Sequence, residues 1–179
     1  MADKKISALT GATTPLAGTE VLPIVQGGAT VKTTVVDVLK LNQPMFSAYA
    51  SAAQTIAASS STKLTLDVEE FDTNNNFSAS RFTPTVAGYY QLSCCVFWNS
   101  AGPSGLATTI ITKSGSTYKS GYGQFTSLGY ASANVSALVY ANGSTDYFEI
   151  FVVQSSATSQ ATAGGSAAVF FTGALVKYA

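Results

Sequence analysis

The acidic side chains of one short segment have the greatest capacity for chemistry in this chain. Asp67, Glu69, Glu70 and Asp72 follow one another closely. Carboxylates at such spacing can ligate a hard cation or act as the acid and base of a glycoside hydrolase. Exposed acidic residues are nevertheless the ordinary case, so we interpret the cluster as the solvated end of a strand. A glycan hydrolase that acts through Glu70 stays open as an alternative.

Other catalytic patterns are missing from the sequence. The chain has no histidine, which excludes His-based triads and His-rich metal sites. The run Gly102 to Gly105 does not have the Gly-x-Ser-x-Gly spacing of a nucleophile elbow, because Gly105 follows the serine directly. The run Gly121 to Gly123 is followed by Thr126 where a dinucleotide loop needs glycine. We interpret both runs as turns, and we predict neither an enzymatic activity nor a cofactor.

Two adjacent cysteines, Cys94 and Cys95, are the remaining reactive side chains. Neighbours on a strand point to opposite faces, so the demanding geometry of a disulfide disfavours a bond between them. A metal or redox role would need a second cysteine pair or a histidine. We therefore predict two reduced cysteines that pack as small buried hydrophobes.

Composition limits the possible partners. Nine basic and nine acidic residues cancel, and only 10% of the 179 residues are charged. This balance removes the basic surface expected of a nucleic-acid-binding protein. No apolar run is long enough to span a membrane, and the first residues lack the apolar core of a signal peptide. We expect a protein that is made in a cytoplasm, without membrane insertion.

From Pro44 onward, short apolar runs alternate with turn-rich stretches, which is typical of an all-β domain. Asn142-Gly143 predicts a β-hairpin between the strands on either side of it. Roughly eight short strands with little helix predict a jelly-roll sandwich. The predicted strands lie near 45–50, 62–67, 88–99, 106–112, 117–125, 132–140, 145–154 and 167–178.

The run from Phe82 to Trp98, FTPTVAGYYQLSCCVFW, carries a family likeness. Its glycine, tyrosine and alternating apolar positions resemble the signature of the globular head of complement C1q, a relative of the tumour-necrosis-factor jelly rolls. The resemblance extends from about Pro44 to the end, where VFFTGALVKY is similar to the family's last strand. It implies a C1q/TNF-like sandwich that forms homotrimers for binding. Calcium occurs in some members, but no residue motif carries a calcium site to this chain.

Two strands near the C-terminus are apolar on both faces. In the strand at 145–154, alternation should direct one apolar set into the sandwich and leave a second apolar set outside. The inward set is Phe148, Ile150 and Val152, and the outward set is Tyr147, Phe151 and Val153. Strands of this kind are buried on both faces, and a lone sandwich would leave a patch that monomers rarely tolerate. Loops of the same chain that cover the second face are the alternative. We predict a homotrimer whose interface includes Tyr147, Phe151, Val153 and Phe171.

Residues 1–43 differ from residues 44–179, which form the trimerisation and binding domain. VLPIVQ and TVKTTV flank Gly27-Gly28 and predict a hairpin, followed by a helical turn or two over Val36 to Leu41. Residues 5–39 resemble the N-terminal segment of many tailed-phage fibre and virion proteins; a flexible leader is the alternative. So small a hairpin needs a partner surface. The candidate attachment residues are Val21, Ile24, Val25, Val31 and Val35.

The two resemblances imply a structural phage virion protein, as a head fibre, capsid decoration or short tail fibre. Its expected partners are other virion proteins, of capsid or tail, and a host-surface glycan. Recognition is assigned to loops 99–105, 114–123 and 155–166, because loops on a rigid sandwich vary freely. Their candidate contact residues are Tyr118, Tyr122 and Tyr130, with ordinary packing as the alternative. A bacterial C1q-like binding module that is not viral is the alternative function.

Overall fold

The computed structural model describes residues 21–34, 43–99, 104–126 and 130–179. The chain divides into two compact units, Met1–Asn42 and Gln43–Ala179. All regular elements in the described ranges are β-strands, as predicted. Within these ranges no helix is long and apolar enough to cross a membrane.

The N-terminal unit contains the predicted hairpin. Strands β1 (Val21–Gln26) and β2 (Ala29–Thr34) pair antiparallel, with Gln26 opposite Ala29. Gly27 and Gly28 form the turn with φ values of 59° and 81°, which glycine adopts without steric cost. The predicted helical turn at Val36 to Leu41 lies outside the described residues.

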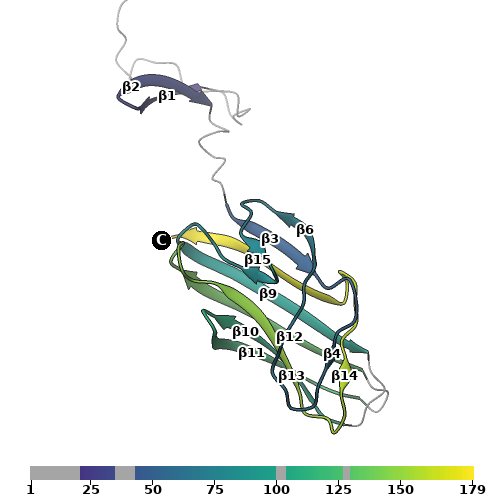
Figure 1. The fold of residues 1–179 in the computed structure, drawn as a ribbon. Helices are drawn as coiled ribbons and strands as arrows, with labels where there is room; N and C mark the ends of the chain where they lie inside the picture. The colour runs from purple at the N-terminus through teal and green to yellow at the C-terminus, as the bar shows by residue number, and fades with distance from the viewer. Residues whose placement is uncertain (1–20, 35–42, 100–103, 127–129) are drawn as a thin grey trace, which may run out of the picture. The chain divides into compact units, whose positions relative to one another are not determined.

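The second unit is a sandwich of two main sheets, and Figure 1 shows their long strands running side by side. The first, here called the β15 sheet, has the order β12-β9-β15-β3-β6; the second, the β13 sheet, has the order β11-β10-β13-β8-β7, with β5 also paired to β13. The β15 sheet contains β3 (Met45–Tyr49), β6 (Val68–Asp72), β9 (Gly88–Asn99), β12 (Tyr130–Ala141) and β15 (Val169–Tyr178). The β13 sheet contains β5 (Thr62–Lys63), β7 (Phe77–Ser78), β8 (Arg81–Phe82), β10 (Leu106–Lys113), β11 (Ser116–Gln124) and β13 (Phe148–Gln154). A small pair, β4 (Thr55–Ile56) and β14 (Gln160–Ala161), forms a separate two-stranded sheet.

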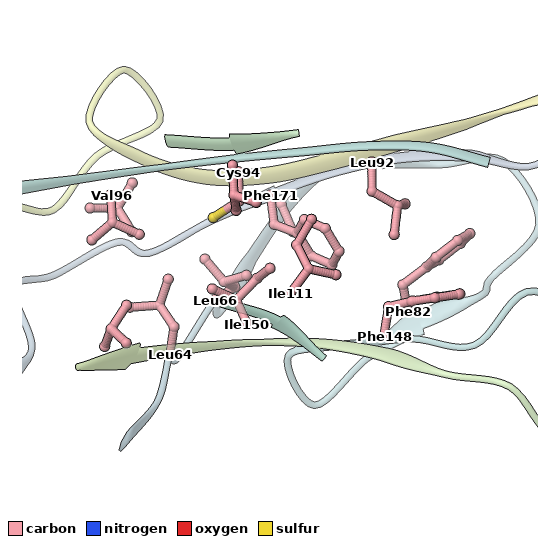
Figure 2. Packing of buried hydrophobic residues seen from close by; sticks show 14 of the residues in the cluster. Leu64, Leu66, Phe82, Leu92, Cys94, Val96, Ile111, Phe148, Ile150 and Phe171 are labelled. Carbon is pink, nitrogen blue, oxygen red and sulfur yellow. The ribbon is translucent and has the colours of Figure 1, made fainter. Parts of the chain in front are cut away.

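The core fills the space between the two sheets because each long strand alternates inward apolar residues with outward ones. In β9 every second residue from Tyr90 to Trp98 is buried, as predicted. In β13 the inward set is Phe148, Ile150 and Val152, also as predicted. Figure 2 shows side chains of β9 and β15 pointing toward those of β13.

The prediction of a hairpin at Asn142-Gly143 is wrong. Strand β12 pairs with β9, whereas β13 pairs with β10, so the turn joins the two sheets instead of two neighbouring strands. The Asn142 side-chain oxygen Oδ1 accepts the backbone N–H groups of Ser144, Thr145 and Asp146. This local capping satisfies the backbone while the chain crosses from one sheet to the other.

The run Gly121 to Gly123 is part of strand β11, so its interpretation as a turn is wrong. A Cβ atom on Gly121 would lie 1.8 Å from the Asn134 carbonyl oxygen, and one on Gly123 would lie 2.2 Å from that of Ser132. These glycines let β11 approach the backbone of β12, where one edge of the sandwich closes. The predicted loop 114–123 is therefore a tight turn at Ser114 and Gly115 followed by this strand.

Candidate oligomer interface and binding surfaces

The outer face of the β15 sheet carries most of the large exposed apolar side chains of the sandwich. Cross-strand pairing sets this face, because residues opposite each other in register share a side. Phe71 pairs with Ser47, and Met45 pairs with Ala174, which places both on the outer side. The exposed side chains of this face are Met45, Phe71, Tyr89, Tyr130, Leu138, Tyr140 and Val176.

Aromatic pairs stand at both ends of this face. Tyr89 is opposite Tyr140 in the register of β9 and β12, and their ring centroids are 5.5 Å apart. At the other end, Phe97 and Tyr130 stack with centroids 5.8 Å apart. Sequence analysis missed these pairs, because they arise only when β9 and β12 are set in register.

Small polar side chains form the middle of the same face. Ser93 and Ser136 place their hydroxyl oxygens 2.9 Å apart, and Gln91 Nε2 donates to Ser136 Oγ over 2.7 Å. Between the aromatic ends lies a hollow of about 400 Å³. It is lined by Ser93, Cys94, Cys95, Asn134, Val135, Ser136 and Phe170. The face therefore combines apolar rims with a hydrogen-bonding floor.

The cysteines occupy opposite faces of β9, as their adjacency predicts. Both are free thiols; Cys94 is buried in the core and Cys95 is half-buried at the hollow. Burial raises the pKa of the Cys94 thiol well above its usual value, with a smaller contribution from Cys95. Only Cys95 therefore departs from the prediction of two buried hydrophobes.

The four residues predicted for the trimer interface separate in the structure. The prediction that Phe171 belongs to the trimer interface is wrong. Its exposed fraction is 0%, and its ring packs edge-on against Phe46 with centroids 4.9 Å apart. Tyr147, Phe151 and Val153 are half-buried at the outer side of β13, the β13 sheet's central strand. Arg81 covers the Tyr147 ring, with its guanidinium carbon 4.0 Å from the centroid.

A buried carboxylate that sequence analysis did not single out joins the short strands β5 and β8 to β13. Glu149 Oε1 accepts from Lys63 Nζ at 2.7 Å and from Arg81 Nε at 2.9 Å. Burial raises the pKa of Glu149, but the hydrogen bonds and charges of Lys63 and Arg81 outweigh it and hold the pKa below its usual value. Breaking such a pair by removing one partner is costly, since it leaves an uncompensated charge.

The acidic cluster serves local structure. Asp67 accepts from the backbone N–H and the hydroxyl of Ser51, and these hydrogen bonds lower the pKa of Asp67. Glu70 accepts from the Ser47 hydroxyl over 2.7 Å. Asp72 accepts from the backbone N–H of Phe77 over 2.6 Å. Among the described residues, no group of His, Cys, Asp or Glu could hold a metal ion.

The three tyrosines predicted as ligand contacts do not form one site. The Tyr118 hydroxyl donates to the Leu138 carbonyl oxygen over 3.0 Å and ties β11 to β12. Tyr122 lies two residues before the end of β11, with 66% of its surface exposed. Tyr130 begins β12 and stacks on Phe97.

The two ends of the sandwich carry different segments. The chain enters at Pro44 beside the C-terminal strand, since Leu175 N–H donates to the Pro44 carbonyl oxygen over 2.9 Å. The described parts of loops 99–105 and 155–166 lie at the opposite end, where β10 begins and β13 ends. The turn at Ser114 and Gly115 lies at the entry end.

The hairpin of the N-terminal unit exposes apolar side chains. Leu22, Ile24 and Val31 share one face, because Ile24 pairs with Val31 and Leu22 lies two residues along the strand. Of the predicted attachment residues, Val21, Ile24, Val25 and Val31 are exposed, whereas Val35 lies outside the described residues.

Several solved structures have the same sandwich fold. Murine APRIL has a TM-score of 0.58 and 9% identity, with 75% of this chain and 99% of that chain covered. The Eiger TNF of S. frugiperda has a TM-score of 0.56 and 8% identity, with 76% and 93% covered. The globular domain of zebrafish complement 1qA protein has a TM-score of 0.51 and 18% identity, with 76% and 99% covered.

A scan against protein-family models and a search of curated proteins found no match. The structural likeness confirms the predicted fold: residues from Gln43 onward form a C1q/TNF-like jelly roll. At these identities the likeness establishes the fold alone.

Proposed function

We propose that this protein is a homotrimeric structural component of a phage particle, as a head fibre, capsid decoration or short tail fibre. Residues 1–43 attach it to other virion proteins, and the jelly roll displays binding loops, with a host-surface glycan as the expected ligand. The protein is made in the host cytoplasm and resides in the virion. It acts by binding, without catalysis.

The observation that carries the trimer is the exposed apolar face of the β15 sheet. Soluble monomers rarely leave a large apolar patch in water. Burying apolar surface contributes roughly 25 cal/mol per Å², before the cost of association. Tyr89, Leu138 and Tyr140 form one such patch at one end of the face. The interface is thus proposed on the β15 sheet, in place of the outer side of β13.

The N-terminal hairpin supports the proposed attachment. A two-stranded hairpin is marginally stable by itself, and strand edges can pair with another protein. Val25, with 75% of its surface exposed, stands on this hairpin. Three copies carried by one trimer would bind together, which strengthens a weak single contact by about 10² or more.

Deleting residues 1–42 tests the attachment. Light scattering and circular dichroism should show a folded trimer of residues 43–179, because the jelly roll has its own core. The truncated protein should be absent from purified particles, whereas the full chain is present. Incorporation of the truncated protein at full occupancy would place attachment in the jelly roll. A folded monomer at micromolar concentration would refute the trimer.

A further inference from the structure

The hollow on the β15 sheet has the size and lining of a seat for a tyrosine ring. Its volume, about 400 Å³, lies within the range of pockets that bind small molecules, roughly 300–1,000 Å³. Phe170 supplies an apolar wall and Cys95 a polarisable sulfur, which makes favourable contacts with aromatic rings. Tyrosine matches this lining because its body is apolar and its tip is polar.

Asn134 provides the polar partner for such a ring. Its side-chain oxygen Oδ1 accepts from the Ser132 hydroxyl over 3.3 Å. Its amide Nδ2 makes no hydrogen bond to any residue in the described ranges, so it is available to donate to a phenol oxygen. Within this floor, the Ser93 and Ser136 hydroxyls already bond to each other.

Tyr122 is the most exposed aromatic side chain of the described residues, with 66% of its surface accessible. Its neighbours Gly121 and Gly123 face β12, so alternation directs Tyr122 to the other side of β11. There it pairs with Thr108, which in turn pairs with Val153 at the outer side of β13. The hollow opens on the opposite outer face of the sandwich, so Tyr122 does not fill the hollow of its own chain.

Tyr122 and the hollow nevertheless stand at the same level along the strands. Gly121 approaches the Asn134 carbonyl and Gly123 approaches that of Ser132, which places Tyr122 between these two levels. A rotation axis parallel to the strands keeps every residue at its own level. A head-to-tail ring of copies about such an axis would therefore bring Tyr122 of one copy to the level of its neighbour's hollow.

We infer that, in the assembled protein, Tyr122 of each copy seats in the hollow of the next copy, between Phe170 and Cys95. The partner is thus a second copy of this chain, and this contact deepens the trimer proposed above, on which it rests. The contact is heterologous, because the donor edge and the accepting face are different surfaces. Closed around a ring, it links every chain to the next.

Thiol cross-linking in the full-length protein tests this seat. The variant Tyr122→Cys is treated with a short bis-maleimide, which bridges thiols several ångströms apart. We expect bridges from residue 122 to Cys95 of the next chain, and covalent trimers on a denaturing gel. The double variant Tyr122→Cys/Cys95→Ser should give no bridge. Thr117→Cys is the matched control, because Thr117 is exposed on the same side of β11 as Tyr122 but nearer the entry end, and it should bridge to Cys95 far less.

Two results distinguish the seat from the trimer itself. A trimer by light scattering in which Thr117→Cys bridges to Cys95 as well as Tyr122→Cys does would overturn the seat and leave the trimer intact. A monomeric wild-type protein would overturn both. Should Tyr122→Cys misfold, Tyr122→Ser replaces it: we expect Cys95 in the assembled variant to react with a maleimide about tenfold faster or more than in wild type. An unchanged rate would overturn the seat.

Discussion

Phe170 and Phe171 are neighbours on β15 that face opposite sides of the sheet. Substituting each in turn should therefore distinguish effects on folding from effects on assembly. Phe171 is fully buried and packs on Phe46 and Phe77. Phe170 is half-buried and lines the hollow on the outer face. We expect Phe171→Ala to destabilise the single chain, and Phe170→Ala mainly to weaken the association of chains.

The expected cost of Phe171→Ala follows from its contacts. Burying a phenylalanine side chain contributes about 1.5–3 kcal/mol, and each aromatic pair adds about 0.5–1.5 kcal/mol. Phe171 makes edge-on pairs with Phe46 at 4.9 Å and Phe77 at 6.5 Å. We therefore expect the unfolding free energy to fall by about 4 kcal/mol, within the usual range for Phe→Ala in cores. At the half-buried position 170, Phe170→Ala should lower the unfolding free energy by about 1 kcal/mol.

Urea unfolding followed by tryptophan fluorescence measures both effects. Trp98 is the only tryptophan in the chain and has 0% of its surface exposed, so its emission should report unfolding of the core. Association stabilises the folded state by mass action, so each variant is unfolded at several protein concentrations. Phe171→Ala should shift the midpoint at every concentration, whereas the effect of Phe170→Ala should grow where wild type associates.

Two outcomes would refute this placement of the two rings. In one, Phe170→Ala lowers the midpoint at low concentration as much as Phe171→Ala does. In the other, Phe171→Ala leaves the midpoint unchanged and only prevents association. Either result would mean that β15 presents its other side to the core.

Three further expectations follow from the same contacts. Glu149 has a lowered pKa in the folded state, so its stabilising effect is present above the unfolded pKa of about 4.3 and is lost as the pH falls through the lower folded pKa. Urea unfolding should show that Glu149→Gln is less stable than wild type at pH 7. The difference in unfolding free energy should narrow below about pH 4. Gly121→Ala should lower the melting temperature by calorimetry, at a cost of about 1–3 kcal/mol, because its Cβ meets the Asn134 carbonyl; Ser120→Ala is the control, and an equal effect would contradict this contact. In dilute, unassembled protein a maleimide should modify Cys95 faster than Cys94, as mass spectrometry of the peptides reports, and equal rates there would contradict the burial of Cys94.

The strands and most of the core were predictable because alternation is a local property. Residues 88–99 alternate so strictly that both the strand and its inward side follow from the sequence. The inward set of Phe148, Ile150 and Val152 was equally predictable. The short strands β4, β7, β8 and β14 were not, since each spans two residues and its pairing depends on distant partners.

Phe171 shows where alternation stops being informative. Strand β15 has apolar residues on both faces, so its own sequence does not say which face is inward. Register decides: Phe171 lies opposite Cys94 of β9 and Ala48 of β3, both of which are inward. Phe170 lies opposite Cys95 and Tyr49 on the outer side. The identity of the interior residue is therefore a property of three strands together.

The prediction of a hairpin at Asn142-Gly143 was wrong for a related reason. The dipeptide favours a tight reversal, and Gly143 indeed has a φ of 71°. A reversal becomes a hairpin only if the two strands meet edge to edge in one sheet. Here β12 and β13 belong to different sheets, and each directs an apolar set toward the core between them, so the turn changes sheets.

The outer face of the β15 sheet also depends on the pairing of several strands, so the sequence of any one strand did not single it out as a candidate interface. Along β12 the outward residues include Ser132, Asn134 and Ser136, which read as an ordinary solvated side. Pairing with β9 brings Tyr140 to Tyr89 and gathers the small residues into a hollow between aromatic ends. A surface built across strands in this way has a shape as well as an apolar area. Shape, more than area, limits which side chain of a neighbouring copy fits there.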